Sequence, residues 1–147
     1  MRRNYGATRA GGFTLTELLV VMVIIVLLAS LVATNAPKWV EQGRITKAKS
    51  DVSQLDAAIR QYMVHCQDPP SQSDGLQALM TKPGGEHADR WQGPYLTREV
   101  PKDGWGRDYQ YKQPGRHNAD FDVYSFGKDG KEGTEDDIGN WGPAEKT

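Results

Sequence analysis

The most apolar part of the chain lies close to its N-terminus. Residues 13–33 read FTLTELLVVMVIIVLLASLVA, 21 residues in which Glu17 is the only charge. A helix needs about 20 apolar residues, at about 1.5 Å of rise each, to cross the hydrocarbon core of a bilayer. The pattern therefore predicts a transmembrane helix over residues 13–36 that carries one unexplained carboxylate.

Beyond this block the apolar positions become periodic. In residues 38–66 they recur at steps of three and four, which places them on one face of a helix. The opposite face carries charges and is expected to be solvated. We therefore expect one helix from Phe13 to about Cys66, with an amphipathic second half that packs on a globular domain. The apolar positions of this half are Ile45, Ala48, Val52, Leu55, Ile59 and Tyr62.

The remaining sequence is rich in turns and holds short strand-like runs. The prolines at 69–70 end the long helix, and Ser73 is expected to cap a short helix over residues 74–81. Residues 109–112 and 121–126 are typical of strands, and a turn-rich connection separates them. An antiparallel pair packed on the long helix gives an α+β fold.

Charge and cysteine content exclude several functional classes. The formal net charge is −1, so no basic field favours nucleic acid as a partner. Cys66 is the only cysteine, so the chain has neither an internal disulfide nor a cysteine-pair metal motif. The three histidines are far apart in the sequence, and no hydrolase, metalloprotease or nucleotide-loop motif is present. We expect no enzyme.

The segment before the apolar block is basic. It holds Arg2, Arg3 and Arg9 and no acid. Basic residues beside an apolar segment stay cytoplasmic, which in a bacterium places the C-terminal part in the periplasm. A cleaved secretory signal and a plain membrane anchor both fit these features. Neither gives Glu17 a role, although a carboxylate at membrane depth costs about 2.5–3.5 kcal/mol.

Cleavage between Gly12 and Phe13 would provide Glu17 with a partner. It would free an α-amine on Phe13, and in an assembly the amine of one subunit would neutralise Glu17 of its neighbour. Opposite charges attract strongly at low dielectric, although each alone is costly to bury. The pair would also set the axial register between subunits, so we expect Glu17 to act in assembly.

These residues together resemble a known family. A basic leader, then Gly12, Phe13 and Glu17, is similar to the signal and transmembrane helix of type IV pilins and pseudopilins. The resemblance implies that residues 1–12 are a leader, removed by prepilin peptidase after Gly12. It also implies N-methylation of Phe13.

Two further segments narrow the resemblance. GLQAL at residues 75–79 and PKDGWGRDYQY at residues 101–111 resemble the major pseudopilins of type II secretion systems. This resemblance implies a pilin-like fold with a periplasmic domain at residues 37–147. It also implies a single-pass protein of the bacterial inner membrane that polymerises into a helical filament and drives protein export across the outer membrane. The implied partners are copies of the same chain, minor pseudopilins, the inner-membrane secretion platform and prepilin peptidase.

A glycine- and acid-rich segment, SFGKDGKEGTEDDIGNW at residues 125–141, follows the second strand-like run. Calcium takes six to eight oxygen ligands with flexible geometry, which suits such a segment. Composition alone leaves a solvated acidic loop equally open. The segment is similar to the calcium loop of major pseudopilins, and this likeness implies structural Ca²⁺. The implied ligands are the side chains of Asp129, Asp136 and Asp137 and the backbone carbonyls of Phe126 and Lys131.

Two alternative functions share some of these features. A major subunit of a surface type IV pilus would have the same leader, but DDIGNW and the absence of a C-terminal cysteine pair argue against it. A membrane-anchored calcium-binding or sensor domain that does not polymerise would need no cleavage, and would leave Glu17 without a role.

Overall fold

A computed structural model describes residues 12–142, apart from the side chains of residues 31–35, 86 and 87. Residues 1–11 of the expected leader and residues 143–147 therefore lie outside the described part. Internal contacts divide the chain into two units, Met1–Trp39 and Val40–Thr147. One long helix belongs to both, and all the strands belong to the second.

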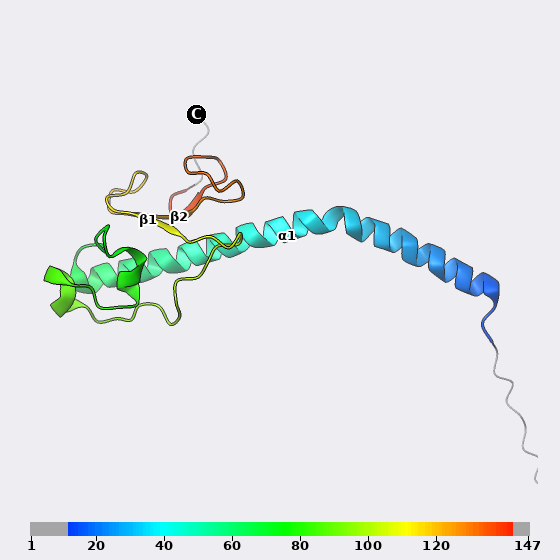
Figure 1. Cartoon of the computed structure of the whole chain (residues 1–147), viewed down its shortest axis with the longest axis horizontal. Helices are drawn as coiled ribbons and strands as arrows, with labels where there is room; N and C mark the ends of the chain where they lie inside the picture. The colour runs from blue at the N-terminus through cyan, green and yellow to red at the C-terminus, as the bar shows by residue number, and fades with distance from the viewer. Residues whose placement is uncertain (1–11, 143–147) are drawn as a thin grey trace, which may run out of the picture. The chain divides into compact units, whose positions relative to one another are not determined.

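The expected long helix is confirmed. Helix α1 runs from Leu15 to Cys66 and includes Pro37 (Figure 1). At its start, Thr14 Oγ1 accepts a hydrogen bond from the backbone N–H of Glu17 at 3.2 Å, which satisfies one of the unpaired amides of a helix N-terminus. The helix ends where Gln67 takes a left-handed φ of 71°.

The N-terminal unit exposes its apolar side chains. Those of residues 13–28 that are large and hydrophobic are 46–81 % exposed in the single chain. Within the described residues, no helix combines the length and the apolar character that a membrane crossing requires. The transmembrane assignment of residues 13–36 stays a prediction.

The expected antiparallel pair of strands is also confirmed. Strand β1, Gln110–Lys112, pairs with β2, Asp122–Ser125, with Tyr111 opposite Val123. A third strand, β3 at Ile138–Gly139, pairs antiparallel with the other edge of β2, which gives the order β1-β2-β3. Strand β3 was not expected, because two residues are too few to show the alternation of a strand.

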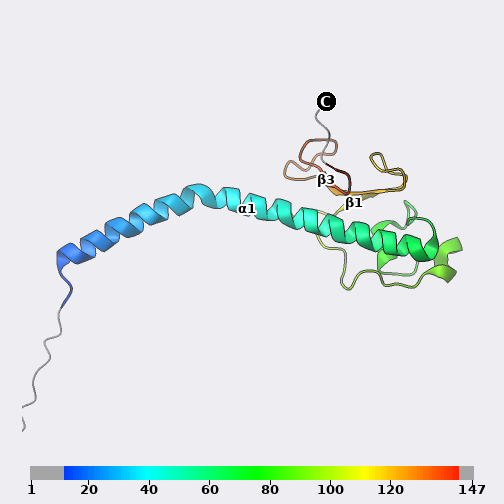
Figure 2. The ribbon, with the colours of Figure 1, turned by 180° about the vertical axis from the view of Figure 1, so that it is seen from behind.

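The core lies between the sheet and the second half of α1. All four residues of β2 are buried, so its side chains are covered on both faces. Figure 2 shows the strands beside this half of α1, with the 3-10 helices near its C-terminal end. The predicted helix face is buried from Ala48 onward, whereas Ile45 is half-buried. The largest apolar or aromatic side chains that are fully buried are Leu55, Ile59, Tyr62, Leu79, Phe121 and Val123, and the core also includes Tyr109 and Tyr111.

The region between α1 and β1 differs from the expectation. The expected helix over residues 74–81 is a shorter 3-10 helix, η1 at Gly75–Leu79. Ser73 does not cap it: Asp74 holds the N-cap position without a side-chain cap, and the Asp74 N–H bonds to Ser71 Oγ at 3.2 Å. A second 3-10 helix, η2 at Gly85–Arg90, was not expected.

Replacing Leu55 with Ala tests the packing of α1 on the sheet. Leu55 is 1 % exposed, so we expect the free energy of unfolding of the full-length chain to fall by about 2–5 kcal/mol, because a cavity replaces the lost methyl groups. Chemical denaturation followed by circular dichroism measures the change. Val64, on the same helix, is 77 % exposed, and Val64→Ala should change stability by less than about 0.5 kcal/mol. Equal effects of the two substitutions would contradict this packing.

Candidate functional site

The expected processing and assembly residues lie at the start of α1. Gly12 and Phe13 precede the helix and are exposed, and Glu17 lies exposed in its first turn. An acid in this turn interacts favourably with the helix dipole. Thr14 and Glu17 also have the spacing of a capping box, a local role for Glu17 that the T-x-x-E pattern would have indicated.

The second candidate region is the acidic loop, residues 126–137, which connects β2 to β3. Its two ends touch, because a Cβ at Gly127 would overlap the carbonyl oxygen of Asp136. Gly127 also has a φ of 62°, a conformation that side chains disfavour. Glycine at this position is therefore what allows the loop to close.

A buried carboxylate fixes the first end of the acidic loop. Oδ1 of Asp103 accepts the backbone N–H groups of Trp105 and Arg107 at 2.9 and 2.8 Å. Its Oδ2 accepts the Ser125 hydroxyl at 2.6 Å, and Ser125 Oγ in turn accepts the Gly127 N–H at 3.1 Å. Burial acts to raise the pKa of Asp103, but these hydrogen bonds outweigh it and the pKa lies below its ordinary value. The turn at residues 103–107 is thus joined to the loop.

Glu132 ties the middle of the acidic loop to the sheet. Its Oε1 accepts hydrogen bonds from the Lys112 ammonium, from the Tyr124 hydroxyl at 3.1 Å, and from Arg116 Nη1 at 3.3 Å. The hydrogen bond from Lys112 is the main reason that the pKa of Glu132 is lowered. These groups are partly exposed, so the cluster orients the loop more than it stabilises the fold.

The expected calcium ligands lie in two parts of the acidic loop. Asp129 Oδ1 accepts the Lys131 N–H at 2.9 Å, and Asp137 Oδ2 accepts the Gly133 N–H at 2.7 Å. Asp137 Oδ1 is buried and lacks a hydrogen-bond donor in the described part of the chain. Among the described residues, no three His, Cys, Asp or Glu side chains form a group that could hold a metal ion. The calcium site stays a prediction, for which Asp137 Oδ1 offers an available oxygen.

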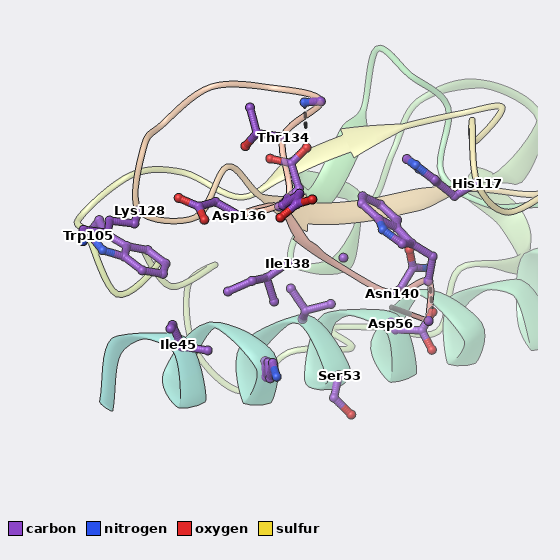
Figure 3. Close-up of a pocket in the computed structure, with 18 of the residues that line it drawn as sticks. Ile45, Ser53, Asp56, Trp105, His117, Lys128, Thr134, Asp136, Ile138 and Asn140 are labelled. Carbon is purple, nitrogen blue, oxygen red and sulfur yellow. Dashed lines mark hydrogen bonds between the residues drawn. The ribbon is translucent and has the colours of Figure 1, made fainter. Parts of the chain in front are cut away.

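A groove of about 1140 Å³ separates the acidic loop from α1. Three residues of its lining each have a buried polar atom without a hydrogen-bond partner among the described residues: Glu41 Oε1, Trp105 Nε1 and Asp137 Oδ1. Acidic, basic and amide side chains also line the groove, so it suits water or another polar occupant. Figure 3 shows Ile138 facing α1 near Ile45, with Trp105 and Lys128 at one end of the groove and His117 and Asn140 at the other.

Asn140, directly after β3, joins this end of the domain to α1 and to β2. Its Nδ2 donates to Asp56 Oδ1 at 3.0 Å, and its Oδ1 accepts the Val123 N–H at 3.1 Å. Beside it, the ring of Trp141 stacks on His117 with centroids 3.9 Å apart. The C-terminal part of the domain thus packs on the turn at residues 113–121.

Asp122 organises that turn and was not singled out in the sequence. Its Oδ2 accepts the N–H groups of Arg116 and His117 at 2.6 and 2.9 Å, and its Oδ1 accepts that of Asn118 at 2.9 Å. Burial acts to raise the pKa of Asp122, but these backbone hydrogen bonds together bring it below the ordinary value of 3.8. The sequence did offer one signal for this role: Asp122 lies two residues after the turn-rich segment PGRHNAD, and carboxylates at turns often bind backbone amides.

Replacing Asp122 with Asn should destabilise the protein by about 1–3 kcal/mol at neutral pH, because an amide group would face backbone donors. Because the folded pKa is lowered, the contribution of Asp122 is fully present above pH 3.8 and is lost as pH falls through the folded pKa. Denaturation of Asp122→Asn should therefore show a weaker loss of stability below about pH 4 than the unchanged chain. Asp120→Asn, at an exposed position, is the matched control. Identical acid profiles for all three chains would contradict this role.

Comparison with known proteins places both regions in one family. The prokaryotic N-terminal methylation motif matches residues 7–33, and the model of type II secretion system (T2SS) protein G matches residues 36–141. The chain is 43 % identical over 143 residues to the type II secretion system core protein G of Pectobacterium carotovorum, which covers 95 % of this chain and 91 % of that protein. It is 42 % identical over 134 residues to the type II secretion system core protein G of Pseudomonas aeruginosa. That match covers 88 % of this chain and 94 % of the relative.

A solved structure supports the same assignment. The crystal structure of the major pseudopilin from the type 2 secretion system of enterohaemorrhagic Escherichia coli matches with a TM-score of 0.62 and 35 % identity. The match covers 73 % of this chain and 94 % of that one. The expected pilin-like fold, a long N-terminal helix packed on a small antiparallel sheet, is therefore confirmed, and the chain belongs to the type II secretion system protein G family, that of the major pseudopilins.

Proposed function

We propose that this chain is the structural subunit of a type II secretion pseudopilus, which polymerises through its N-terminal helix and drives protein export across the outer membrane. The observation that carries the proposal is the match of a methylation motif and a protein G domain to consecutive parts of one chain. The names of the relatives favour a secretion subunit over a type IV pilus subunit or a calcium sensor that does not polymerise. The role is structural rather than enzymatic.

Processing would prepare the subunit for assembly. Prepilin peptidase would cut between Gly12 and Phe13, and Phe13 would then be N-methylated. The exposed position of both residues ahead of α1 is compatible with access by these enzymes. Before assembly the chain would be held in the inner membrane by residues 13–36, with its C-terminal domain in the periplasm beside the secretion platform.

Assembly would bury the apolar side chains that the single chain exposes. Residues 13–28 present large hydrophobic groups around α1, and neighbouring copies would take the place of lipid around them, so these groups would stay out of water when the subunit leaves the membrane. Head-to-tail contacts of this kind do not close on themselves and therefore make filaments. Glu17 would pair with the α-amine of a neighbouring Phe13, and minor pseudopilins would add to the same filament.

Replacing Glu17 with Ala should abolish filament assembly and secretion, because the neighbouring α-amine would be buried without its counter-charge. Electron microscopy of sheared pseudopili and an assay of secreted protein measure the two outcomes. Thr14→Ala is the control: it removes the hydroxyl that caps α1, at a cost of about 1 kcal/mol, and leaves the carboxylate in place. Intact mass of each variant establishes that residues 1–12 were removed. Normal filaments from processed Glu17→Ala would overturn the assembly role.

We further propose that the acidic loop binds structural calcium. Its side-chain ligands would be Asp129, Asp136 and Asp137, with the carbonyl oxygens of Phe126 and Lys131. An all-oxygen donor set suits a hard cation, and the unpartnered buried Oδ1 of Asp137 supports a cation nearby. The ion would neutralise carboxylates that otherwise repel one another. Because periplasmic calcium is plentiful, a weak site would still be filled.

Calcium should raise the melting temperature of the full-length chain in detergent. At a calcium concentration of about one hundred times the dissociation constant, the free energy of unfolding should rise by about 2.7 kcal/mol. Asp137→Asn should remove most of this gain, since it replaces a ligand oxygen. Glu135→Gln makes the same change of charge at a neighbouring exposed position and should leave the gain intact. An unchanged melting temperature across a calcium titration would refute the calcium proposal, but not the assembly proposal.

A further inference from the structure

Trp39 differs from the other three tryptophans because it belongs to the N-terminal unit and not to the globular domain. It is 62 % exposed, although an indole ring is large and mostly apolar. Tryptophans of the domain are used in its packing: Trp91 Nε1 donates to the carbonyl oxygen of Ala78 at 2.8 Å, and Trp141 stacks on His117. Trp39 thus presents a large amphipathic ring that the single chain leaves uncovered.

The place of Trp39 in the sequence matches the thickness of a bilayer. Phe13 and Trp39 are the aromatic residues at the two ends of the apolar segment, and no aromatic residue lies between them. They are 26 residues apart, which corresponds to about 39 Å along a helix. A bilayer with its headgroup layers is about 40–45 Å thick. With Phe13 at one surface of a bilayer, Trp39 therefore reaches the other.

The chemistry of this position suits a phospholipid surface. An indole prefers the boundary between acyl chains and headgroups, where its ring is in an apolar layer and its N–H can donate to an oxygen. Because side chains of a helix tilt toward its N-terminus, the ring of Trp39 extends from its Cα toward the apolar segment. The neighbouring Lys38 is exposed and is the first charge after Glu17, so its ammonium can contact lipid phosphates at the same level.

We propose that Trp39 binds the headgroup layer of the periplasmic leaflet before assembly, with its N–H donating to an ester or phosphate oxygen of a phospholipid and its ring against the acyl chains. The inference rests on the proposed function, in which residues 13–36 hold the subunit in the membrane. Because α1 continues without a break past Trp39, a fixed depth for this side chain also fixes the level at which α1 leaves the bilayer. Assembly then has to withdraw the indole from the lipid surface.

Tryptophan fluorescence of the full-length chain in vesicles of phosphatidylethanolamine and phosphatidylglycerol tests this inference. Some of the lipid carries bromine, a contact quencher, either near the headgroup end of the acyl chains or near their methyl end. Headgroup-end bromine should quench one tryptophan of four, up to about a quarter of the emission if all four emit equally, and methyl-end bromine should quench less. Trp39→Phe should lose most of this quenching. Trp91→Phe, the same change inside the domain, should keep it, and circular dichroism establishes that each variant is folded.

Flotation of the vesicles separates this inference from the membrane proposal beneath it. A chain that floats with the vesicles but is quenched equally with and without Trp39 would overturn the inference and leave membrane insertion intact. Stronger quenching of Trp39 by methyl-end bromine would also overturn it, because the ring would then lie in the hydrocarbon core. Blue-shifted but unquenched emission from Trp39, even with few copies per vesicle, would assign its surface to a second copy and overturn the lipid contact. A chain that does not float would contradict both membrane insertion and the inference.

Discussion

The burial of one helix face against a very small sheet is the interaction on which the rest of the domain depends. Strands of three, four and two residues cannot form a stable sheet alone, because such short ladders bury too little surface. Helix α1 supplies the missing surface from Ala48 to Tyr62, and β2 is covered on both faces. Leu55, Ile59 and Phe121 therefore stabilise the sheet and the helix together. The loops that carry the family features start from this shared core.

Polar anchors then hold the irregular segments that the small sheet cannot organise. Asp103 accepts hydrogen bonds from the turn at residues 103–107 and, through Ser125, fixes the start of the acidic loop. Asp122 accepts hydrogen bonds from three backbone amides of the turn at residues 113–121. In both cases one carboxylate takes the place of several ladder hydrogen bonds. Because a buried carboxylate must be matched by donors, each anchor also fixes the conformation of the segment it binds.

Much of the fold could be predicted from the sequence, because the features concerned are periodic or long. The steps of three and four from Ala48 to Tyr62 gave the buried face of α1, and the runs around Tyr111 and Val123 gave the central pair of strands. The family likeness of residues 12–17 and of DDIGNW gave the candidate sites. Strand β3 was missed because its two residues are too few to show the alternation of a strand.

The anchors could not be predicted for a different reason. Asp103 and Asp122 bind backbone amides and, for Asp103, a hydroxyl that lies 22 residues away in the sequence, and any polar side chain on a surface turn would look the same. The DGWG turn and the acid after PGRHNAD were visible, but their partners depend on the tertiary fold. The same is true of the groove between α1 and the acidic loop, whose walls come from segments distant in the chain.

The hydrogen bond between Asn140 and Asp56 has a consequence for the order in which the domain is completed. Its two residues are 84 positions apart, the largest separation among the side-chain hydrogen bonds described above. Contacts between distant residues form late, because the intervening chain must first be brought together. Asn140 can therefore reach Asp56 only after the chain between them has folded back. A chain cut short before residue 140 would keep the residues of α1, β1 and β2 but would lack the side chain that joins α1 to β2 at this point.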